Sequence, residues 1–468
     1  MANSWAGSFG FSYDALSRRT QMTRPNSITT NYSYDSLSRL LSVLHQASGS
    51  TIDGATYTVD NAGNRTSKQD WLASVTSNYT YDATYELTQA TQSGNATESY
   101  TYDPVGNRQS SLGISPYSYN VSNELTSTPS ISYTYDSNGN TLTSTTGSNT
   151  TSYNWDFENR LTSVTLPNNG GTVTFKYDPF GRRIYKSSSS TTSIFAYDGN
   201  NLVEEANSSG TEVASYSEGL SIDEPLAMNR SSAVSFYEAD GLGSVTSLSS
   251  SAGALAQTYT RDSFGKQTAS SGSLTNPFQY TAREFDAETN LYFYRARYYD
   301  PETGRFMNED PIGISGGLNL YSYVKNSPIN LTDATGLQRQ KPKRPEVDPN
   351  AVFFVCCKKG QLAICENNLG QNVPSDQSVT SCLYEHEDKH LQDFRNDCPA
   401  GTKNFCADKP NNWPVVVDKS DQPNVECRGY CQEMTCLERK GLLPKVTQRK
   451  TFVEGQIKKF CGATGCPK

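Results

Sequence analysis

The chain has 468 residues, of which 35% are hydrophobic, and a formal net charge of −8. This length is too great for one ordinary hydrophobic core, so it predicts two or more domains. The acidic balance offers no basic face to neutralise phosphates, and we therefore do not expect nucleic acid as a partner. No apolar run is long enough to predict a membrane span, and the N-terminus MANSWAGSFGFSYD lacks the pattern of a secretory signal.

A short phrase recurs along the first part of the chain. Two aromatic residues flank a third residue and are followed by an acidic or amide residue, as in FSYDALSRR, YTYDPVGNR and FKYDPFGRR. Successive phrases are 16 to 25 residues apart, which is near the short end of known repeat periods. The acidic or amide residue of the ten phrases is Asp14, Asp35, Asp60 (after Tyr-Thr-Val), Asp82, Asp103, Asn120, Asp136, Asp156, Asp178 or Asp198.

Each phrase predicts a strand, a tight turn and a returning strand. An aromatic–x–aromatic pattern places both rings on one face of a strand, and Asp followed by Gly, Asn or small residues favours a turn. One unit cannot bury its aromatic face alone, so the units should stack side by side. Polar sequence of this kind can also be disordered, but the regular aromatic pairs, in a chain with 29 Tyr and 18 Phe, favour an ordered β-repeat.

The phrase resembles the YD repeats of Rhs proteins and of their teneurin and toxin-complex relatives. The resemblance covers roughly residues 10–337. Its strongest part, at 292–336, is similar to the Rhs-associated core and contains YFYRARYYDPETGRFMNEDPIG. The resemblance implies a mainly β shell, formed by a curved sheet that wraps around an interior. We therefore expect YD repeats over residues 1–285 and an Rhs-associated core over residues 286–337.

Three polar residues of the core are candidates for chemistry: Arg297, Asp310 and Asp333. Two carboxyl groups can activate water on a peptide carbonyl if one is protonated and the other ionised, and an arginine can stabilise the ionised one. From the residues alone, Asp-Pro and Asp-Ala-Thr-Gly are ordinary turn patterns. The Rhs resemblance implies instead that the three residues form an aspartyl-type self-cleavage site.

In the family that this core resembles, the cut follows a closing D-P-x-G motif and one apolar residue. The corresponding segment here is DATGL at 333–337, so the expected cut lies between Leu337 and Gln338. Ala334 stands where the family has proline, which makes the turn looser.

All 11 cysteines lie between Cys356 and Cys466. Such a step in composition implies a domain boundary, and the basic, proline-rich QRQKPKRPEVDP before it predicts a linker over residues 338–350. We expect residues 351–468 to form a small α-rich or α+β domain. Its cysteine density is typical of secreted domains held by disulfides, and reduced thiols in a cytosolic domain are the alternative.

The resemblance implies that the part after the core is a variable toxin. It also implies delivery by a contact-dependent or contractile secretion apparatus, and a cognate immunity protein. We therefore expect a secreted or surface-delivered protein without a conventional signal peptide.

The stretch YEHEDKHLQD at 384–393 holds two of the three histidines in the chain. On a helix, His386 and His390 share one face and can present both rings to a Zn²⁺ ion. Glu387, next to the first ligand, could act as general base on a metal-bound water. The pattern predicts a zinc site, and a solvated, charged helix turn is the alternative.

A catalytic zinc ion needs a third protein ligand. His45 lies among the repeats, so that ligand must be a carboxylate or a thiolate. A second helix is predicted in the region 425–440, and Glu426 near its start is our choice, because HExxH followed by a later Glu resembles the gluzincin pattern. Glu433 and Asp393 remain alternatives.

Cys427 and Cys431 are four residues apart on the same predicted helix. They could form a structural zinc site with the two histidines, which would leave Glu387 without a role. More simply, they could hold the helix in place through disulfides, whose pairing the sequence does not define.

Together these features predict a polymorphic toxin with a β-repeat shell, a self-cleaving core and a zinc-dependent, peptidase-like effector that acts on a peptide or protein. Two alternatives remain open. One is a non-enzymatic cell-surface repeat protein with a disulfide-stapled binding tail. The other is a toxin of different chemistry, in which the histidine helix is only scaffold.

Overall fold

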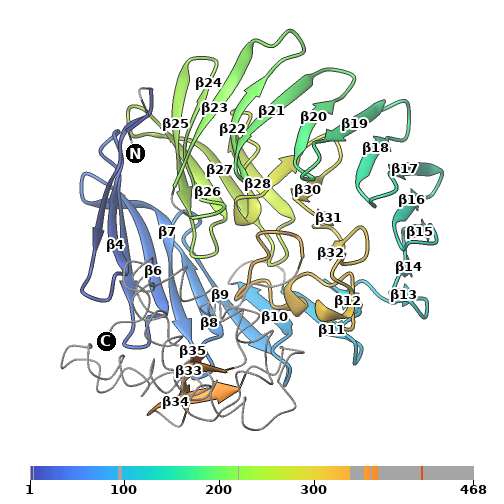
Figure 1. Ribbon diagram of the computed structural model, residues 1–468, viewed down its shortest axis with the longest axis horizontal. Helices are drawn as coiled ribbons and strands as arrows, with labels where there is room; N and C mark the ends of the chain where they lie inside the picture. The colour runs from blue at the N-terminus through green and yellow to red at the C-terminus, as the bar shows by residue number, and fades with distance from the viewer. Residues whose placement is uncertain are drawn as a thin grey trace, which may run out of the picture. The chain divides into compact units, whose positions relative to one another are not determined.

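The computed structural model describes residues 2–3, 5–92, 97–219 and 221–337, together with three strands farther along the chain (Figure 1). The contacts divide the chain into two units, Met1–Gln340 and Lys341–Lys468. In the described part of the first unit, the helical segments are three short 3-10 turns, η1 (Tyr280–Ala282), η2 (Gly313–Ser315) and η3 (Val324–Asn326). Among the described residues, no helix has the length and hydropathy needed to cross a membrane. The prediction of a mainly β repeat region is confirmed.

A short N-terminal hairpin, β1 (Ala2–Asn3) and β2 (Gly7–Ser8), precedes the first large sheet. That sheet has ten strands, and each pairs antiparallel with the next along the chain. The strands are β3 (Gly10–Tyr13), β4 (Arg19–Thr23), β5 (Thr29–Tyr34), β6 (Leu40–Ala47), β7 (Ser50–Val59), β8 (Arg65–Asp70), β9 (Val75–Tyr81), β10 (Leu87–Gln92), β11 (Glu98–Tyr102) and β12 (Arg108–Ser111).

The second large sheet has sixteen strands in the same sequential antiparallel order. They are β13 (Ser118–Tyr119), β14 (Leu125–Ser127), β15 (Ser132–Tyr135), β16 (Thr141–Thr146), β17 (Asn149–Trp155), β18 (Leu161–Thr165), β19 (Thr172–Tyr177), β20 (Arg183–Ser187), β21 (Thr192–Asp198), β22 (Asn201–Ala206), β23 (Glu212–Glu218), β24 (Pro225–Arg230), β25 (Ala233–Ala239), β26 (Val245–Ser250), β27 (Leu255–Arg261) and β28 (Gln267–Gly272).

One kind of turn begins at the Asp or Asn of nine of the ten phrases. At Asp35, the backbone N–H donates to the carbonyl of Arg39, and the N–H of Ser38 donates back to the carbonyl of Asp35, both at 3.0 Å. The Asp35 carboxylate accepts the N–H groups of Leu37 and Arg39 at 2.9 Å. Ser38 has a φ of +62°, a conformation that favours Gly, Asn and short polar residues. The phrase therefore needs Asp or Asn at its first turn position and usually Gly, Asn or Ser at its fourth.

The second aromatic residue of most phrases ties its strand to the one before. The tyrosine hydroxyl, or the indole N–H of the tryptophan, donates a hydrogen bond to the carbonyl of the first residue of the preceding strand. The pairs are Tyr34 with Arg19, Tyr81 with Arg65, Tyr102 with Leu87, Tyr119 with Arg108, Tyr135 with Leu125, Trp155 with Thr141, Tyr177 with Leu161 and Tyr197 with Arg183. Each tie anchors one hairpin to the end of the previous turn.

The two large sheets, β3–β12 and β13–β28, together form a curved wall. The segment after the repeats forms a four-stranded sheet in the concavity of this wall (Figure 1). Its strands are β29 (Glu284–Asp286), β30 (Leu291–Tyr294), β31 (Arg297–Asp300) and β32 (Arg305–Phe306). Phe293 and Tyr298 of this sheet pack in one buried cluster with Tyr153 and Phe175 of the wall. The first aromatic residues of the phrases thus bury their rings against the core sheet, which fixes the core relative to the wall.

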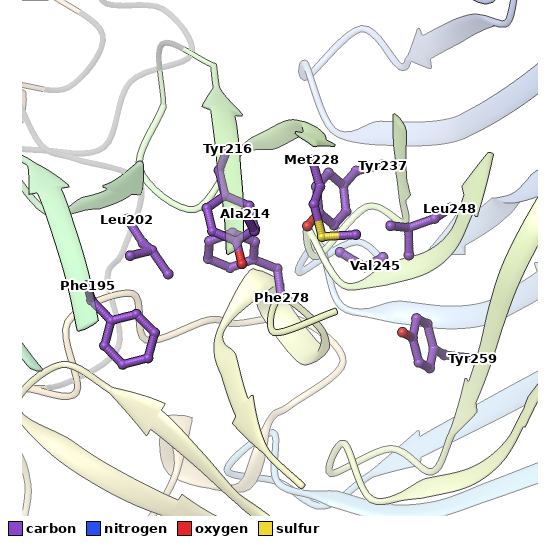
Figure 2. Close-up of a cluster of buried hydrophobic side chains, with 10 residues drawn as sticks. All are labelled: Phe195, Leu202, Ala214, Tyr216, Met228, Tyr237, Val245, Leu248, Tyr259 and Phe278. Carbon is purple, nitrogen blue, oxygen red and sulfur yellow. The ribbon is translucent and has the colours of Figure 1, made fainter. Parts of the chain in front are cut away.

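A second buried cluster joins later strands of the wall to the segment that leads into the core (Figure 2). Tyr216, Tyr237 and Val245 come from β23, β25 and β26, and Phe278 lies just before η1. The rings of Tyr216 and Phe278 meet edge to face, with centroids 5.1 Å apart. Such contacts add to the free energy gained from the buried apolar area.

The N-terminal sheet also packs against the later part of the second sheet, since β7 contacts both β25 and β26. Arg24 donates to the carbonyl of Tyr237 at 2.8 Å, and the buried carboxyl of Asp53 accepts the hydroxyls of Thr246 and Ser247. The contact between the two sheets forms a seam. His45 lies in this seam, and burial lowers its pKa to about 3. A neutral imidazole is therefore a structural part of the seam, in agreement with its placement among the repeats.

The turns differ from the predicted phrases in two respects. At Asp198, which pairs with Asn201, the chain makes a two-residue turn of another type. Turns of the common type also begin at Asn207, Asp240 and Asp262, where no aromatic pair precedes them. The turn chemistry therefore extends beyond the aromatic phrase by which the repeats were recognised.

In the second unit the described strands are β33 (Phe353–Lys358), β34 (Gln361–Glu366) and β35 (Trp413–Pro414), in the order β34-β33-β35. Cys356 and Cys357 lie in β33, and Cys365 lies in β34. The two predicted helices and the predicted disulfides lie outside the described residues. The α-rich or α+β class of this domain, and the domain boundaries at 285, 337 and 350, remain predictions.

Replacing Leu248, a fully buried residue of the Figure 2 cluster, by Ala should lower the free energy of unfolding by about 2–5 kcal/mol, because the site loses apolar contacts and keeps a cavity. Leu318→Ala is the matched control, since Leu318 is 75% exposed and should change stability by less than about 0.5 kcal/mol. Denaturant unfolding of both variants measures the difference. Equal losses for the two would contradict this assignment of the core.

Candidate self-cleavage site

Arg297, Asp310 and Asp333 come from different segments of the core and meet in one buried cluster. Arg297 is the first residue of β31, Asp310 follows β32, and Asp333 lies after η3, near the end of the described range 221–337. Arg297 Nη2 lies 3.0 Å from Asp310 Oδ2 and 3.5 Å from Asp333 Oδ2. One guanidinium nitrogen is therefore shared between two carboxyl groups.

Several contacts hold the guanidinium in place. Its carbon lies 3.6 Å from the centre of the Phe306 ring, and Nη1 donates to the carbonyl of Leu320 at 2.9 Å. Nε donates to the carbonyl of Gly336. Burial disfavours the charged form and lowers the pKa of Arg297 to about 10, against the opposing effect of the two carboxylates. The group remains a cation at neutral pH.

Asp310 differs electrostatically from an exposed aspartate. Burial raises the pKa of its carboxyl, and the nearby Asp333 acts in the same direction, while Arg297 opposes both. The N–H of Ile312 donates to Asp310 Oδ1 at 3.1 Å. A protonated form of Asp310 therefore persists to higher pH than it would in water.

The Asp333 side chain organises the turn that follows it. Its Oδ1 atom accepts the N–H groups of Thr335 at 3.2 Å, Gly336 at 2.9 Å and Leu337 at 3.3 Å. Gly336 has a φ of +71°, and a β-carbon at this position would lie 2.3 Å from the carbonyl oxygen of Tyr294. Glycine is therefore required here by both conformation and space.

The carbonyl groups of the same turn are held by three consecutive residues, the two in the turn before β31 and the first residue of β31. Arg295 donates from its side chain to the carbonyl of Ala334. The N–H of Ala296 donates to the carbonyl of Thr335 at 3.2 Å, and Arg297 donates to that of Gly336. The segment that precedes the predicted cut is thus fixed through its N–H groups and through its carbonyl groups.

A cavity of about 570 Å³ adjoins this turn. Thr332 and Ala334 line it on the core side, and Asp223 and Glu224, which follow β23, line it on the wall side. Neither Arg297 nor the two aspartates are among its lining residues. The cavity therefore reaches the turn at 333–337 without being lined by the carboxyl pair.

The predicted zinc ligands His386, His390 and Glu426, and the predicted base Glu387, lie outside the described residues. The alternatives Glu433 and Asp393, and the two cysteines of the second predicted helix, lie there too. Within the described residues, no group of three or more His, Cys, Asp or Glu side chains is placed to hold a metal ion. The zinc site remains a prediction.

Sequence reasoning missed Arg295 and Asp223. Asp223 pairs with Arg295 across 72 residues, at 2.7 Å, and no motif in SIDEP marks it as a partner of the core. The RAR pattern of the core drew attention only to Arg297. The left-handed φ of Arg295, which distinguishes the position, is a property of the backbone that the sequence does not display.

Residues 64–329 match the family model described as the teneurin YD-shell, which is more than half of the chain, and residues 13–51 match the RHS repeat model. The chain belongs to the teneurin YD-shell family. The resemblance to YD repeats is thereby confirmed.

Among curated relatives, the tRNA3(Ser)-specific nuclease WapA of Bacillus spizizenii is 31% identical over 273 residues, which are 55% of this chain and 12% of the relative. The double-stranded DNA deaminase toxin A of Burkholderia cenocepacia is 27% identical over 521 aligned positions, covering 98% of this chain and 35% of the relative. This YD-shell chain thus spans between about an eighth and about a third of the length of these two relatives.

Solved structures confirm the shell fold. The crystal structure of TcdB2-TccC3 without its hypervariable C-terminal region covers 70% of this chain, with 22% identity and a TM-score of 0.59, and the match spans 19% of that chain. A mutant Tc holotoxin pore of Photorhabdus luminescens covers 73% of this chain and 19% of its own, with 21% identity and a TM-score of 0.61.

Replacing Arg297 by Met should leave two buried carboxyl groups without their shared cation and cost about 3–5 kcal/mol of stability. Burial without a cation favours the neutral carboxyl in the folded state, so the stability that remains falls as the pH rises. We expect the loss in melting temperature to be larger at about pH 8 than at about pH 5.

The matched control is Arg160→Met. Arg160 forms a partly exposed pair with Asp156 in a wall turn, and such pairs contribute at most about 1 kcal/mol. A deficit for the Arg297 variant that did not change with pH would contradict the shared-cation arrangement.

Proposed function

We propose that this chain is part of an Rhs-type polymorphic toxin, in which a YD-repeat shell carries a core that cuts the chain between Leu337 and Gln338. The cut would separate the effector, residues 338–468, from the shell. The observation that supports the proposal is the meeting of Arg297, Asp310 and Asp333 at a turn that leads directly to this bond.

The proposed reaction is hydrolysis of one peptide bond. An ionised carboxylate takes a proton from a water molecule, whose oxygen attacks the Leu337 carbonyl. The other carboxyl gives a proton to the departing nitrogen of Gln338, the C–N bond breaks, and Leu337 becomes a new carboxyl end. The arrangement needs one protonated and one charged carboxyl group at the same time.

The described contacts support a division of these roles. Four donors converge on one oxygen of Asp333 and stabilise negative charge there, which suits the ionised partner. Burial raises the pKa of Asp310, which suits the proton donor. Arg297 lies within reach of both carboxyl groups and would stabilise the ionised one.

The names of the relatives support a toxin with an interchangeable effector. One relative is named as a tRNA nuclease and another as a double-stranded DNA deaminase toxin, although both match the same chain. By the same reasoning we propose delivery by a secretion apparatus and neutralisation by an immunity protein. A non-enzymatic surface protein is less well supported, because these relatives are named for enzymatic activities.

For the effector we propose a zinc-dependent hydrolase with peptide bonds as substrate. The HExxH pattern supports it: His386 and His390 would bind the metal together with Glu426, and Glu387 would accept and return the proton of the attacking water. When bound, zinc would lower the pKa of that water and polarise the scissile carbonyl.

An effector that acts on nucleic acid is the competing proposal, because the relatives named above act on tRNA and DNA. Zinc deaminases of nucleobases carry a C-x-x-C pair, and no two cysteines in this chain have that spacing. A nuclease is therefore the stronger form of the competitor.

Full-length protein should appear after purification as two fragments with the new ends at Leu337 and Gln338, as measured by intact mass. Asp333→Asn should leave the chain uncut, because the amide cannot serve as the ionised partner. Asp136→Asn is the matched control, since Asn120 performs the same turn function elsewhere in the wall. A single intact band for the unmodified protein would refute the self-cleavage proposal.

Self-cleavage should also slow as the pH rises, because the protonated form of Asp310 is lost above its raised pKa. The measurement is the rate of fragment appearance after synthesis at several values between about pH 5.5 and pH 8.5. A rate that increased steadily over this range would assign the proton donor to another group.

The effector proposal predicts about one bound zinc ion per full-length chain and proteolysis of a peptide library that chelation abolishes. His386→Ala should lose the metal, Glu387→Gln should keep it and lose activity, and Asp388→Asn, at a variable position within the motif, should change neither. Degradation of tRNA or duplex DNA by the Glu387→Gln protein at the unmodified rate would favour the nuclease.

A further inference from the structure

Arg295 occupies a position where arginine is unexpected. It is the first of the two residues that turn the chain from β30 into β31, between the paired Tyr294 and Arg297. Its φ is +60°, a conformation in which the side chain of an ordinary residue meets the backbone and which glycine adopts without cost. A strained residue persists only where its surroundings hold it, and such residues cluster at functional sites.

The surroundings of Arg295 hold its side chain at several points. Nη2 donates to Asp223 Oδ1 at 2.7 Å and to the carbonyl of Asn200 at 3.2 Å, and Nη1 lies 3.2 Å from Asp223 Oδ2. Nη1 also donates to the carbonyl of Ala334. The wall thus supplies a carboxylate that aims the guanidinium, and the guanidinium in turn holds the cleavage turn.

Asp223 is itself fixed. Arg283 donates to the same carboxylate and, on its other side, to the carbonyl of Phe293 in β30. Loss of Arg295 would therefore leave Asp223 with a cationic partner. This arrangement allows Arg295 to be changed without leaving a buried carboxylate unpaired.

We propose that Arg295 is a positioning residue for self-cleavage, which fixes the Ala334 peptide and thereby the scissile bond three residues later. The inference rests on the self-cleavage proposed above. Asp333 holds the peptide between Ala334 and Thr335 through its N–H group, and among the described contacts the Arg295 side chain holds the same peptide through its carbonyl. A proline at 334 would restrict the start of the same turn by fixing φ of residue 334. The side-chain contact supplies that restriction in a chain that has alanine.

Two substitutions separate this role from a general contribution to stability. Arg295→Gly removes the side chain and relieves the strained φ, so the folded shell should remain. Ala334→Pro restores rigidity to the turn by a different route, without replacing any contact to Asp223. If Arg295 acts through the turn, the second substitution should compensate for the first.

The experiment follows the cleavage of full-length chains after a short pulse of cell-free synthesis. Arg295→Gly should slow fragment appearance by about 10- to 100-fold, because displacement of the reacting bond by about an ångström has an effect of that size. Ala334→Pro alone should cleave at the unmodified rate, and the double variant should recover to within a few-fold of it. Arg295→Lys, which keeps the charge for Asp223 but lacks the planar fork of donors, should be intermediate.

Folding is checked in the uncut Asp333→Asn background, where Arg295→Gly should leave the circular dichroism and the melting temperature nearly unchanged. If the unmodified chain is cut and Arg295→Gly is cut equally fast, the positioning role is refuted while self-cleavage stands. If Arg295→Gly is slow and the proline does not restore the rate, action through the turn is refuted. If the unmodified chain is not cut at all, the proposed function itself fails.

Discussion

The hydrogen bond from the second aromatic residue of a phrase to the first carbonyl of the preceding strand is the contact on which the shell depends. An antiparallel wall of 26 strands in two sheets could otherwise slip or flatten between hairpins. The tie repeats at Tyr34, Tyr81 and five further tyrosines, and once through Trp155, and it fixes each hairpin against the last turn of its neighbour. Each bond contributes only about 1 kcal/mol, but its repetition from β5 to β21 helps to fix the register of that part of the wall.

The wall in turn determines where the core can be. The first aromatic of a phrase points inward and packs against the core sheet, as Phe175 does against Tyr298. The wall therefore holds β31 at Tyr298, next to Arg297, whose guanidinium lies between two distant aspartates. The wall also contributes to the turn at 333–337. Asp223 of the wall binds Arg295 of the core, and Arg295 donates to the carbonyl of Ala334 in that turn. Residues of both the repeats and the core therefore position the site.

Local chemistry explains what the sequence could predict. The turn at Asp35 depends on atoms within five residues, and its pattern is visible in the sequence. The turns at Asp240 and Asp262 were not predicted, because the repeats were recognised by their aromatic pair and no such pair precedes these two residues. The meeting of Asp310 with Asp333 could be expected only from a family resemblance, because each lies in an ordinary turn pattern. The pair of Asp223 with Arg295 depends on how far the wall curves, and no local pattern encodes that curvature.

The contacts that hold residues 333–337 would determine what remains at the site after the expected cut. All the described contacts that hold this segment lie upstream of the expected cut, so none of them would be lost when the bond breaks. The new terminal carboxylate at Leu337 would stay beside Arg297 and its two aspartates, like a product that never leaves an enzyme. Such a centre would work once per molecule, and the cleaved shell would retain its own tail as a permanent inhibitor.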